Sequence, residues 1–114
     1  MNFAPLPSVE AAAVPSDALV LDVREMDEWA AGHVEGALHV PMSDFVARFG
    51  EVTEAVAEGG RAYVMCRVGG RSAQVTQYLV QQGIEAVNID GGMLAWEGAG
   101  RPMVTDSGAA AVVL

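Results

Sequence analysis

The single cysteine of this chain, Cys66, opens the stretch CRVGGRS, in which two arginines and two glycines follow the thiol. The chain contains no lysine, so its six cationic side chains are all arginines, and Arg67 and Arg71 are among them. Cationic neighbours favour the thiolate, which is the nucleophilic form of cysteine. A glycine-rich turn lets successive backbone N–H groups point at an anion. The spacing therefore predicts a nucleophilic cysteine in an anion-binding loop formed by Cys66, Arg67, Val68, Gly69, Gly70 and Arg71.

A second interpretation of Cys66 is a small apolar residue buried at the end of a strand, a common environment for free cysteines. The C-x-x-x-x-R spacing, the glycine pair and the position between an apolar run and a helical pattern favour the reactive interpretation. The stretch lacks the G-x-x-x-x-G-K-[ST] pattern, so it does not support a nucleotide-binding P-loop.

The segments around this loop alternate between short apolar runs and amphipathic stretches, which predicts alternating strands and helices. Strands are expected at residues 18–23, 36–41, 61–66 and 85–90. Helices are expected at residues 9–14, 25–32, 42–60 (as one helix or two), 71–83 and 91–98. This alternation predicts an α/β fold with a central, mainly parallel sheet flanked by helices. Cys66 and Arg24 would then lie at the carboxyl ends of strands, where such sheets bind their ligands.

Length and composition predict a single domain over residues 1–114. A chain of 114 residues with 52% hydrophobic residues is large enough for one core and too small for two. We expect the core over about residues 8–104 and a loosely held tail over residues 105–114. No apolar run is long enough to span a bilayer, and the start MNFAPLPSVE does not resemble a secretory signal. One cysteine cannot form an internal disulfide, which favours a reducing, cytoplasmic setting.

The charge of the chain narrows the class of partner. A net charge of −9 argues against nucleic acid, because phosphate backbones bind basic surfaces. The arginines beside Cys66 are then a local cationic site on an acidic protein. His33 and His39 lack other ligands at metal-binding spacing, so we expect structural roles for them and no metal site.

Three motifs occur in a recognisable order: LDVREMDEWAAGHVEGALHVP, then CRVGGRS, then IDGGMLAW. The chain resembles the single-domain rhodaneses, a family of sulfurtransferases, and the family pattern runs from about Ala18 to Trp96. The resemblance implies that Cys66 accepts sulfur as a persulfide and that residues 67–71 cradle this persulfide and the donor anion. It implies no metal or organic cofactor. The implied partners are a small, thiosulfate-like donor and a thiol, cyanide or protein acceptor, with neither nucleic acid nor a membrane involved.

Further residues match the family pattern around the loop. Asp22 and Arg24 match its DVR motif, whose charged groups lie near the active-site face. They could support the site or simply pair with each other, and the sequence leaves both roles open. Glu28 and the stretch GHVEGA match positions that mainly shape the fold. His39 departs from the pattern, which more often has asparagine there.

Two alternatives to catalysed sulfur transfer follow from the same loop. Phosphatases and arsenate reductases also place a cysteine and an arginine around an anion, but they use a longer C-x-x-x-x-x-R loop. The loop of this chain is one residue shorter, and arsenate reduction needs a resolving cysteine that the chain lacks. The other alternative is a persulfide carrier or anion-binding module with little turnover.

Overall fold

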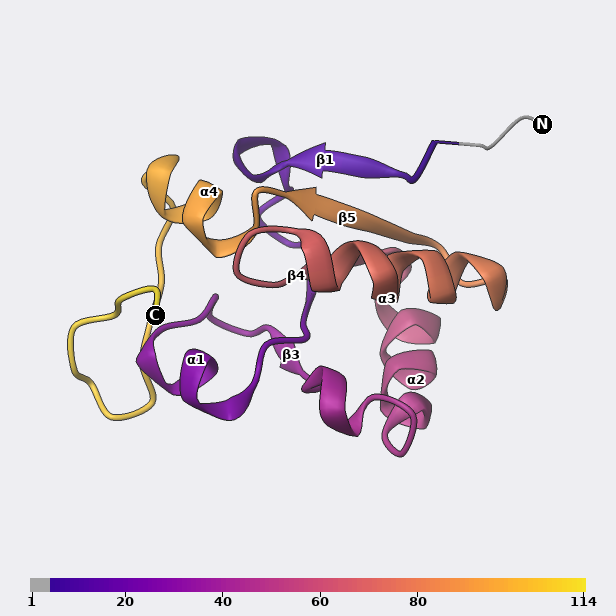
Figure 1. The fold of residues 1–114 in the computed structure, drawn as a ribbon, viewed down its shortest axis with the longest axis horizontal. Helices are drawn as coiled ribbons and strands as arrows, with labels where there is room; N and C mark the ends of the chain where they lie inside the picture. The colour runs from indigo at the N-terminus through magenta and orange to yellow at the C-terminus, as the bar shows by residue number, and fades with distance from the viewer. Residues whose placement is uncertain (1–4) are drawn as a thin grey trace.

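The computed structural model describes residues 5–114 and shows one sheet of five parallel strands with helices on both faces (Figure 1). The strands are β1 (Ser8–Glu10), β2 (Leu19–Asp22), β3 (Leu38–His39), β4 (Ala62–Met65) and β5 (Ala86–Asp90). The helices are α1 (Met26–Ala31), α2 (Phe49–Gly59), α3 (Gly70–Gln81) and α4 (Gly92–Gly98), with short 3₁₀ helices η1 (Ala11–Ala13) and η2 (Met42–Asp44). The sheet order is β1-β5-β4-β2-β3, and every neighbouring pair is parallel. The predicted α/β fold is confirmed.

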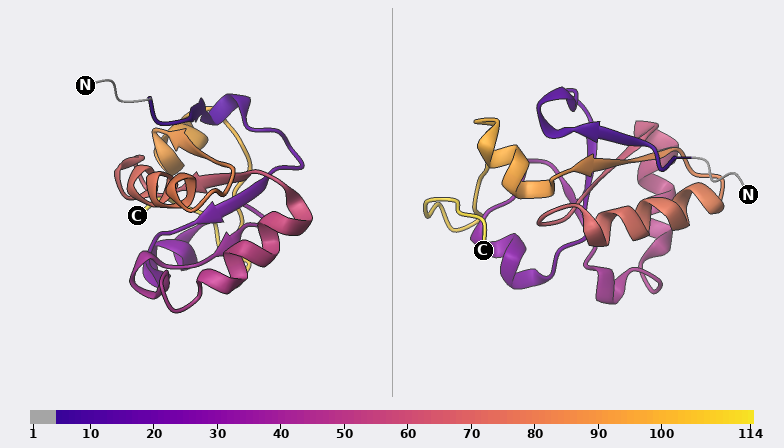
Figure 2. Two further views of the ribbon diagram at one scale, coloured as in Figure 1. Left: turned by 90° about the vertical axis from the view of Figure 1, so that its right-hand side faces the viewer. Right: turned by 45° about the horizontal axis from the view of Figure 1, so that its top comes forward.

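Apolar side chains fill both sides of the sheet, and Figure 2 shows the resulting layers from two further directions. On one side α3 packs through Val75 and Leu79 into a cluster that also includes Cys66. On the other side α4 packs through Met93 and Trp96. Apolar runs such as LVLD and AYVM suit strands that are covered on both faces.

The helix expected over residues 9–14 is wrong. Ser8–Glu10 instead forms β1 and pairs in parallel with β5, which places Val9 beside Ile89. Only Ala11–Ala13 are helical, and they form a single 3₁₀ turn. A helix this short forms too few hydrogen bonds to compete with pairing along an open sheet edge. The other predicted strands and helices are present, with β3 shortened and residues 42–60 divided between η2 and α2.

All five strands end at the same edge of the sheet because they run parallel. At this edge β4 leads into α3 through Cys66, β2 leads into α1 through Arg24, and β5 leads into α4 through Gly91. The turn from β4 to α3 spans only residues 66–69. The topology therefore brings the cysteine loop together with the first turns of two helices.

The last ten residues, 105–114, turn back toward α1 and the cysteine loop (Figure 1, yellow). The N–H of Val112 donates to the backbone oxygen of Ala31 at 2.9 Å. Nε of Arg67 donates to the backbone oxygen of Leu114 at 2.6 Å. That this segment is loosely held stays a prediction. Across residues 5–114, no helix combines the length and apolar character needed to cross a membrane.

Candidate functional site

Cys66 lies directly after β4, where the chain turns into α3, and the residue is 1% exposed. Its Sγ accepts a hydrogen bond from the N–H of Gly69 at 3.1 Å. The hydroxyl oxygen of Ser72 lies 3.2 Å from the same sulfur. A backbone donor and a hydroxyl at this distance stabilise negative charge on the sulfur atom.

Glycine allows the loop backbone to turn toward this sulfur. Gly69 has a φ of 108°, a left-handed conformation that side chains disfavour. In this conformation its N–H points at Sγ of Cys66. The side-chain amide of Asn88 on β5 donates to the backbone oxygen of Gly69 at 3.2 Å. The loop is thus fixed by the neighbouring strand as well as by its own turn.

The first turn of α4 packs directly against the loop backbone. The N–H of Met93 donates to the backbone oxygen of Cys66 at 2.9 Å, and that of Leu94 donates to the oxygen of Arg67 at 3.1 Å. A Cβ atom at Gly92 would come within 2.3 Å of the Cys66 oxygen. The motif IDGGMLAW therefore supplies a glycine where any side chain would collide with the active-site backbone.

The guanidinium of Arg71 forms a two-pronged ion pair with Glu28 of α1. Nη1 donates to Oε1 at 2.7 Å and Nη2 donates to Oε2 at 2.8 Å. The hydrogen bonds from Arg71 lower the pKa of Glu28 to about 2, and Glu28 in turn raises the pKa of Arg71. From the sequence we expected Arg71 to bind the anion, but in the structure each of its terminal nitrogens donates a hydrogen bond to Glu28.

Arg67 and Val68 form the exposed rim of the loop, and Val68 is 54% exposed. Arg67 differs from Arg71 because its described contact is with a backbone oxygen, that of Leu114. The side chain of Arg67 is therefore exposed at the rim of the loop and held there by this contact.

Asp22 and Arg24 form a fully buried ion pair at the end of β2, with Nη2 and Oδ2 2.8 Å apart. The guanidinium of Arg24 also donates to the backbone oxygens of Glu28 and Gly32, at 3.1 and 2.8 Å. These bonds join the middle of α1 and its C-terminal cap to the end of β2. Of the two roles that the sequence left open, the geometry supports the structural one.

Both histidines stack on the indole of Trp29. The ring centroid of His33 lies 3.6 Å from that of Trp29, and the centroid of His39 lies 4.4 Å from it, with nearly parallel planes. Nε2 of His39 lies 2.7 Å from the backbone oxygen of Arg24. Within residues 5–114, no three His, Cys, Asp or Glu side chains are grouped so that they could hold a metal ion.

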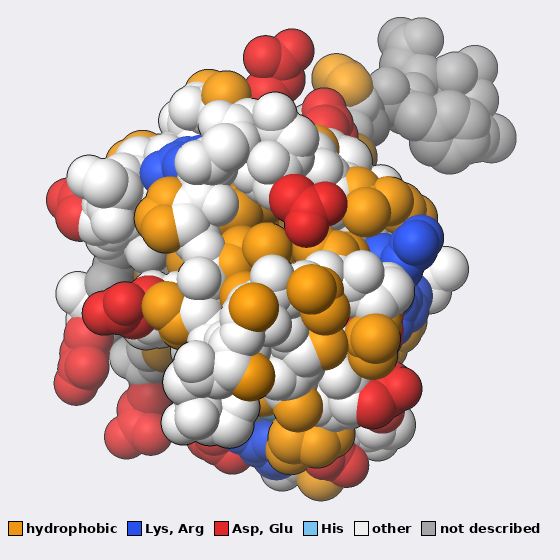
Figure 3. Space-filling view, turned by 90° about the vertical axis from the view of Figure 1, so that its left-hand side faces the viewer, with side chains coloured by type: hydrophobic (Ala, Val, Ile, Leu, Met, Phe, Trp, Pro, Cys, Tyr) orange, Lys and Arg blue, Asp and Glu red, His pale blue; other side chains and the backbone are white. Residues whose placement is uncertain are grey.

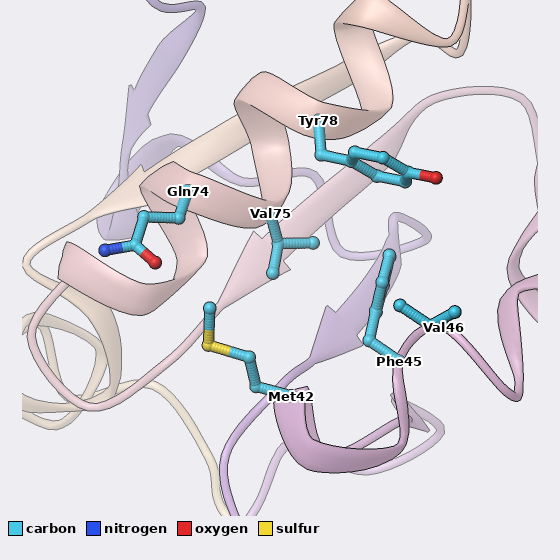
Figure 4. A pocket seen from close by; sticks show the side chains of 6 residues that line it. All are labelled: Met42, Phe45, Val46, Gln74, Val75 and Tyr78. Atoms are coloured by element: carbon cyan, nitrogen blue, oxygen red, sulfur yellow. The ribbon is translucent and has the colours of Figure 1, made fainter.

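One face of the molecule has an apolar centre with acidic side chains around it. Seen from the edge where the strands end, hydrophobic side chains gather in the middle of the face, with acidic side chains scattered around them (Figure 3). A groove of about 300 Å³ opens between the middle of α3 and the segment after β3 (Figure 4). Its lining residues are Met42, Phe45, Val46, Gln74, Val75 and Tyr78.

Sequence reasoning missed three residues that shape this site: Ser72, Asn88 and Gly92. Ser72 follows the predicted loop directly, and Asn88 is a polar residue inside an apolar strand, so both carried a weak signal. The role of Glu28 was also missed, because its pairing with Arg71 spans 43 residues of sequence.

Comparison with known proteins identifies the family. The model of the rhodanese-like domain matches residues 9–99. YtwF of Bacillus subtilis, a candidate sulfurtransferase by name, is 40% identical over 83 residues, which cover 73% of this chain and 77% of YtwF. A sulfurtransferase of Allochromatium vinosum is 37% identical over 93 residues, which cover 81% of this chain and 83% of that protein. The crystal structure of a rhodanese-related protein from Thermoplasma volcanium has a TM-score of 0.76 at 29% identity, covering 86% of this chain and 97% of that one. The chain therefore belongs to the rhodanese-like domain family.

Proposed function

We propose that this protein is a sulfurtransferase that takes a sulfane sulfur from thiosulfate or a related donor onto Cys66. The sulfur is held as a persulfide and passed to a thiol, cyanide or protein acceptor, in a reducing setting such as the cytoplasm. The observation that supports this most directly is the sulfur of Cys66, which meets the N–H of Gly69 and the hydroxyl of Ser72 within a rhodanese-like domain. Residues 67–71 are the proposed anion-binding loop.

Two displacements at sulfur account for the whole reaction. The Cys66 thiolate attacks the outer sulfur of thiosulfate, a new S–S bond forms, and sulfite leaves with the electron pair of the bond that breaks. An acceptor thiolate or cyanide then attacks the outer sulfur of the persulfide, and the Cys66 thiolate leaves. The covalent intermediate separates the two half-reactions, so the kinetics should be ping-pong.

The first prediction concerns Cys66 itself. After incubation with thiosulfate, the intact mass of the protein should increase by one sulfur atom, and cyanide or a small thiol should remove this increase. Cys66→Ser should show no increase and no transfer while unfolding at nearly the same temperature, because serine is similar in size but a poor nucleophile here. Intact-mass spectrometry and thermal unfolding measure both outcomes.

The possible results separate the alternatives. No mass increase in the unchanged protein would contradict the proposal. A persulfide that forms but resists discharge by cyanide, small thiols and protein thiols would favour the carrier alternative. Hydrolysis of aryl phosphates at a rate comparable to sulfur transfer would favour a phosphatase, which the short loop from Cys66 to Arg71 argues against.

A further inference from the structure

Ser72 presents a buried hydroxyl to the reacting sulfur. The residue is fully buried in the first turn of α3, and its Oγ lies 3.2 Å from Sγ of Cys66. Thr76, one turn further along the same helix, is equally buried. Its hydroxyl, however, donates to the backbone oxygen of Ser72 at 2.7 Å. Two buried hydroxyls on one helix therefore differ in whether they contact the sulfur.

The charge on the sulfur fixes the direction of the Ser72 hydrogen bond. A hydroxyl and a thiol can each donate or accept. A thiolate has no proton, so the hydroxyl of Ser72 must donate to it, as the N–H of Gly69 does. Hydrogen bonds to charged acceptors are stronger than those between neutral groups. The hydroxyl therefore stabilises the thiolate more than the thiol, and more than the neutral inner sulfur of a persulfide.

We propose that Ser72 is a catalytic residue whose hydroxyl stabilises negative charge on Sγ of Cys66. The charge is present whenever Cys66 is a thiolate and forms again when the persulfide is discharged. In that discharge the acceptor bonds to the outer sulfur, the S–S bond breaks, and its electron pair moves to Sγ, where the Ser72 hydroxyl already points. The role in discharge rests on the proposed function, whereas the role in stabilising the free thiolate does not.

Other titratable and charged groups on the elements that meet at this edge of the sheet stay in place when only the Ser72 hydroxyl is removed. They are Arg67 and Arg71 on the loop, Glu28 of α1, the Asp22–Arg24 pair after β2, His39 of β3 and Asp90 at the end of β5. A change in thiol reactivity in Ser72→Ala therefore reports the hydroxyl rather than a rearranged charge.

Alkylation of Cys66 by iodoacetamide over a series of pH values tests this role without requiring sulfur transfer. Ser72→Ala should move the midpoint of the rate profile to higher pH by about one unit, the size expected for a hydrogen bond to a charged group. Thr76→Val removes the other buried hydroxyl of α3 and should leave the profile unchanged. Ser72→Thr keeps a hydroxyl and should stay close to the unchanged protein.

Coincident profiles for Ser72→Ala and the unchanged protein would overturn the proposal. An equal displacement in Thr76→Val would also overturn it, since it would indicate a general loosening of α3. If circular dichroism shows that Ser72→Ala does not fold, Ser72→Thr decides, because a displaced profile despite the retained hydroxyl contradicts the proposal. Failure of thiosulfate to load Cys66 would leave all these profiles readable, so the proposed function and this inference can fail separately.

Discussion

At the residue scale, the two arginines of the cysteine loop are held in different ways. Arg71 gives both terminal nitrogens to the carboxylate of Glu28, whereas Arg67 is exposed and contacts a backbone oxygen. The carboxylate of Glu28 takes one N–H of each terminal nitrogen and compensates the charge of Arg71, so this guanidinium attracts a second anion less strongly than an unpaired one would. We therefore expect Arg67 to contact the donor anion directly and Arg71 to hold the first turn of α3 in place.

Arg67→Gln should raise the KM for thiosulfate by about tenfold, the loss expected for one hydrogen bond to a charged group. The unfolding temperature should stay nearly unchanged, because the side chain is exposed. Arg61→Gln is the matched control, since Arg61 is also an exposed arginine but lies at the start of β4, away from the loop. Steady-state transfer from thiosulfate to cyanide measures both variants. An equal KM for Arg67→Gln and Arg61→Gln would show that Arg67 does not bind the donor anion.

At the scale of elements, the Glu28–Arg71 pair joins α1 to α3, and its strength depends on pH. Glu28 has its pKa lowered from 4.5 to about 2, chiefly by the hydrogen bonds from Arg71. A carboxyl group with a lowered folded-state pKa contributes stability above its unfolded-state pKa and loses it as the pH falls toward the folded-state value. The contribution should therefore be complete above about pH 4.5 and disappear toward about pH 2.

Urea unfolding of the unchanged protein and of Glu28→Gln across this pH range tests that linkage. The free energy of unfolding should fall more steeply with decreasing pH in the unchanged protein, because only its carboxylate resists protonation in the folded state. Glu51→Gln is the control, since the pKa of Glu51 is also lowered, by Arg48, but on an exposed pair that salt screens. Parallel curves for the unchanged protein and Glu28→Gln would show that the pair contributes nothing to folding.

Strands and helices could be predicted where the sequence of the segment itself has the pattern of apolar residues typical of that element. The apolar runs of β2 and β4 and the apolar stripe of α3 are local patterns, so their existence followed from sequence. β1 was not predictable, because Ser8 and the alanines after it resemble a capped helix and only pairing with the distant β5 makes a strand there.

The same distinction applies to the site. Cys66 and the residues after it are contiguous, so their chemistry could be read from spacing alone. Glu28 meets Arg71 across 43 residues, and Leu114 meets Arg67 across 47, and no local pattern encodes such contacts. The collision that Gly92 avoids with Cys66 likewise depends on how two helices and two strands are packed.

At the scale of the whole molecule, an acidic protein has to attract an anionic donor. The net charge is −9, and acidic side chains surround the apolar centre of the face where the strands end (Figure 3). Carboxylates at 2.7–2.8 Å already compensate Arg24 and Arg71. Arg67 contacts an oxygen of Leu114 and is the other cation of the loop, and it opposes a much larger negative charge. We therefore expect long-range repulsion to exceed the local attraction for small anions.

The range of this repulsion depends on salt, which gives the last prediction. The screening length is about 30 Å at 0.01 M ionic strength and about 8 Å at 0.15 M. The radius of gyration is 13.3 Å, so nearly the whole molecule repels an approaching anion at low salt and only its nearby part does at high salt. Alkylation of Cys66 by iodoacetate, which is anionic, should therefore accelerate with added salt relative to alkylation by neutral iodoacetamide. The ratio of the two rates cancels any effect of salt on the thiolate itself.

The value of kcat/KM for thiosulfate should rise with added salt even more steeply than this ratio, because thiosulfate carries two negative charges. If the ratio of the iodoacetate rate to the iodoacetamide rate falls with added salt, Arg67 and Arg71 together attract anions more strongly than the acidic surface repels them. In that case Arg71 also binds the anion, despite its ion pair with Glu28.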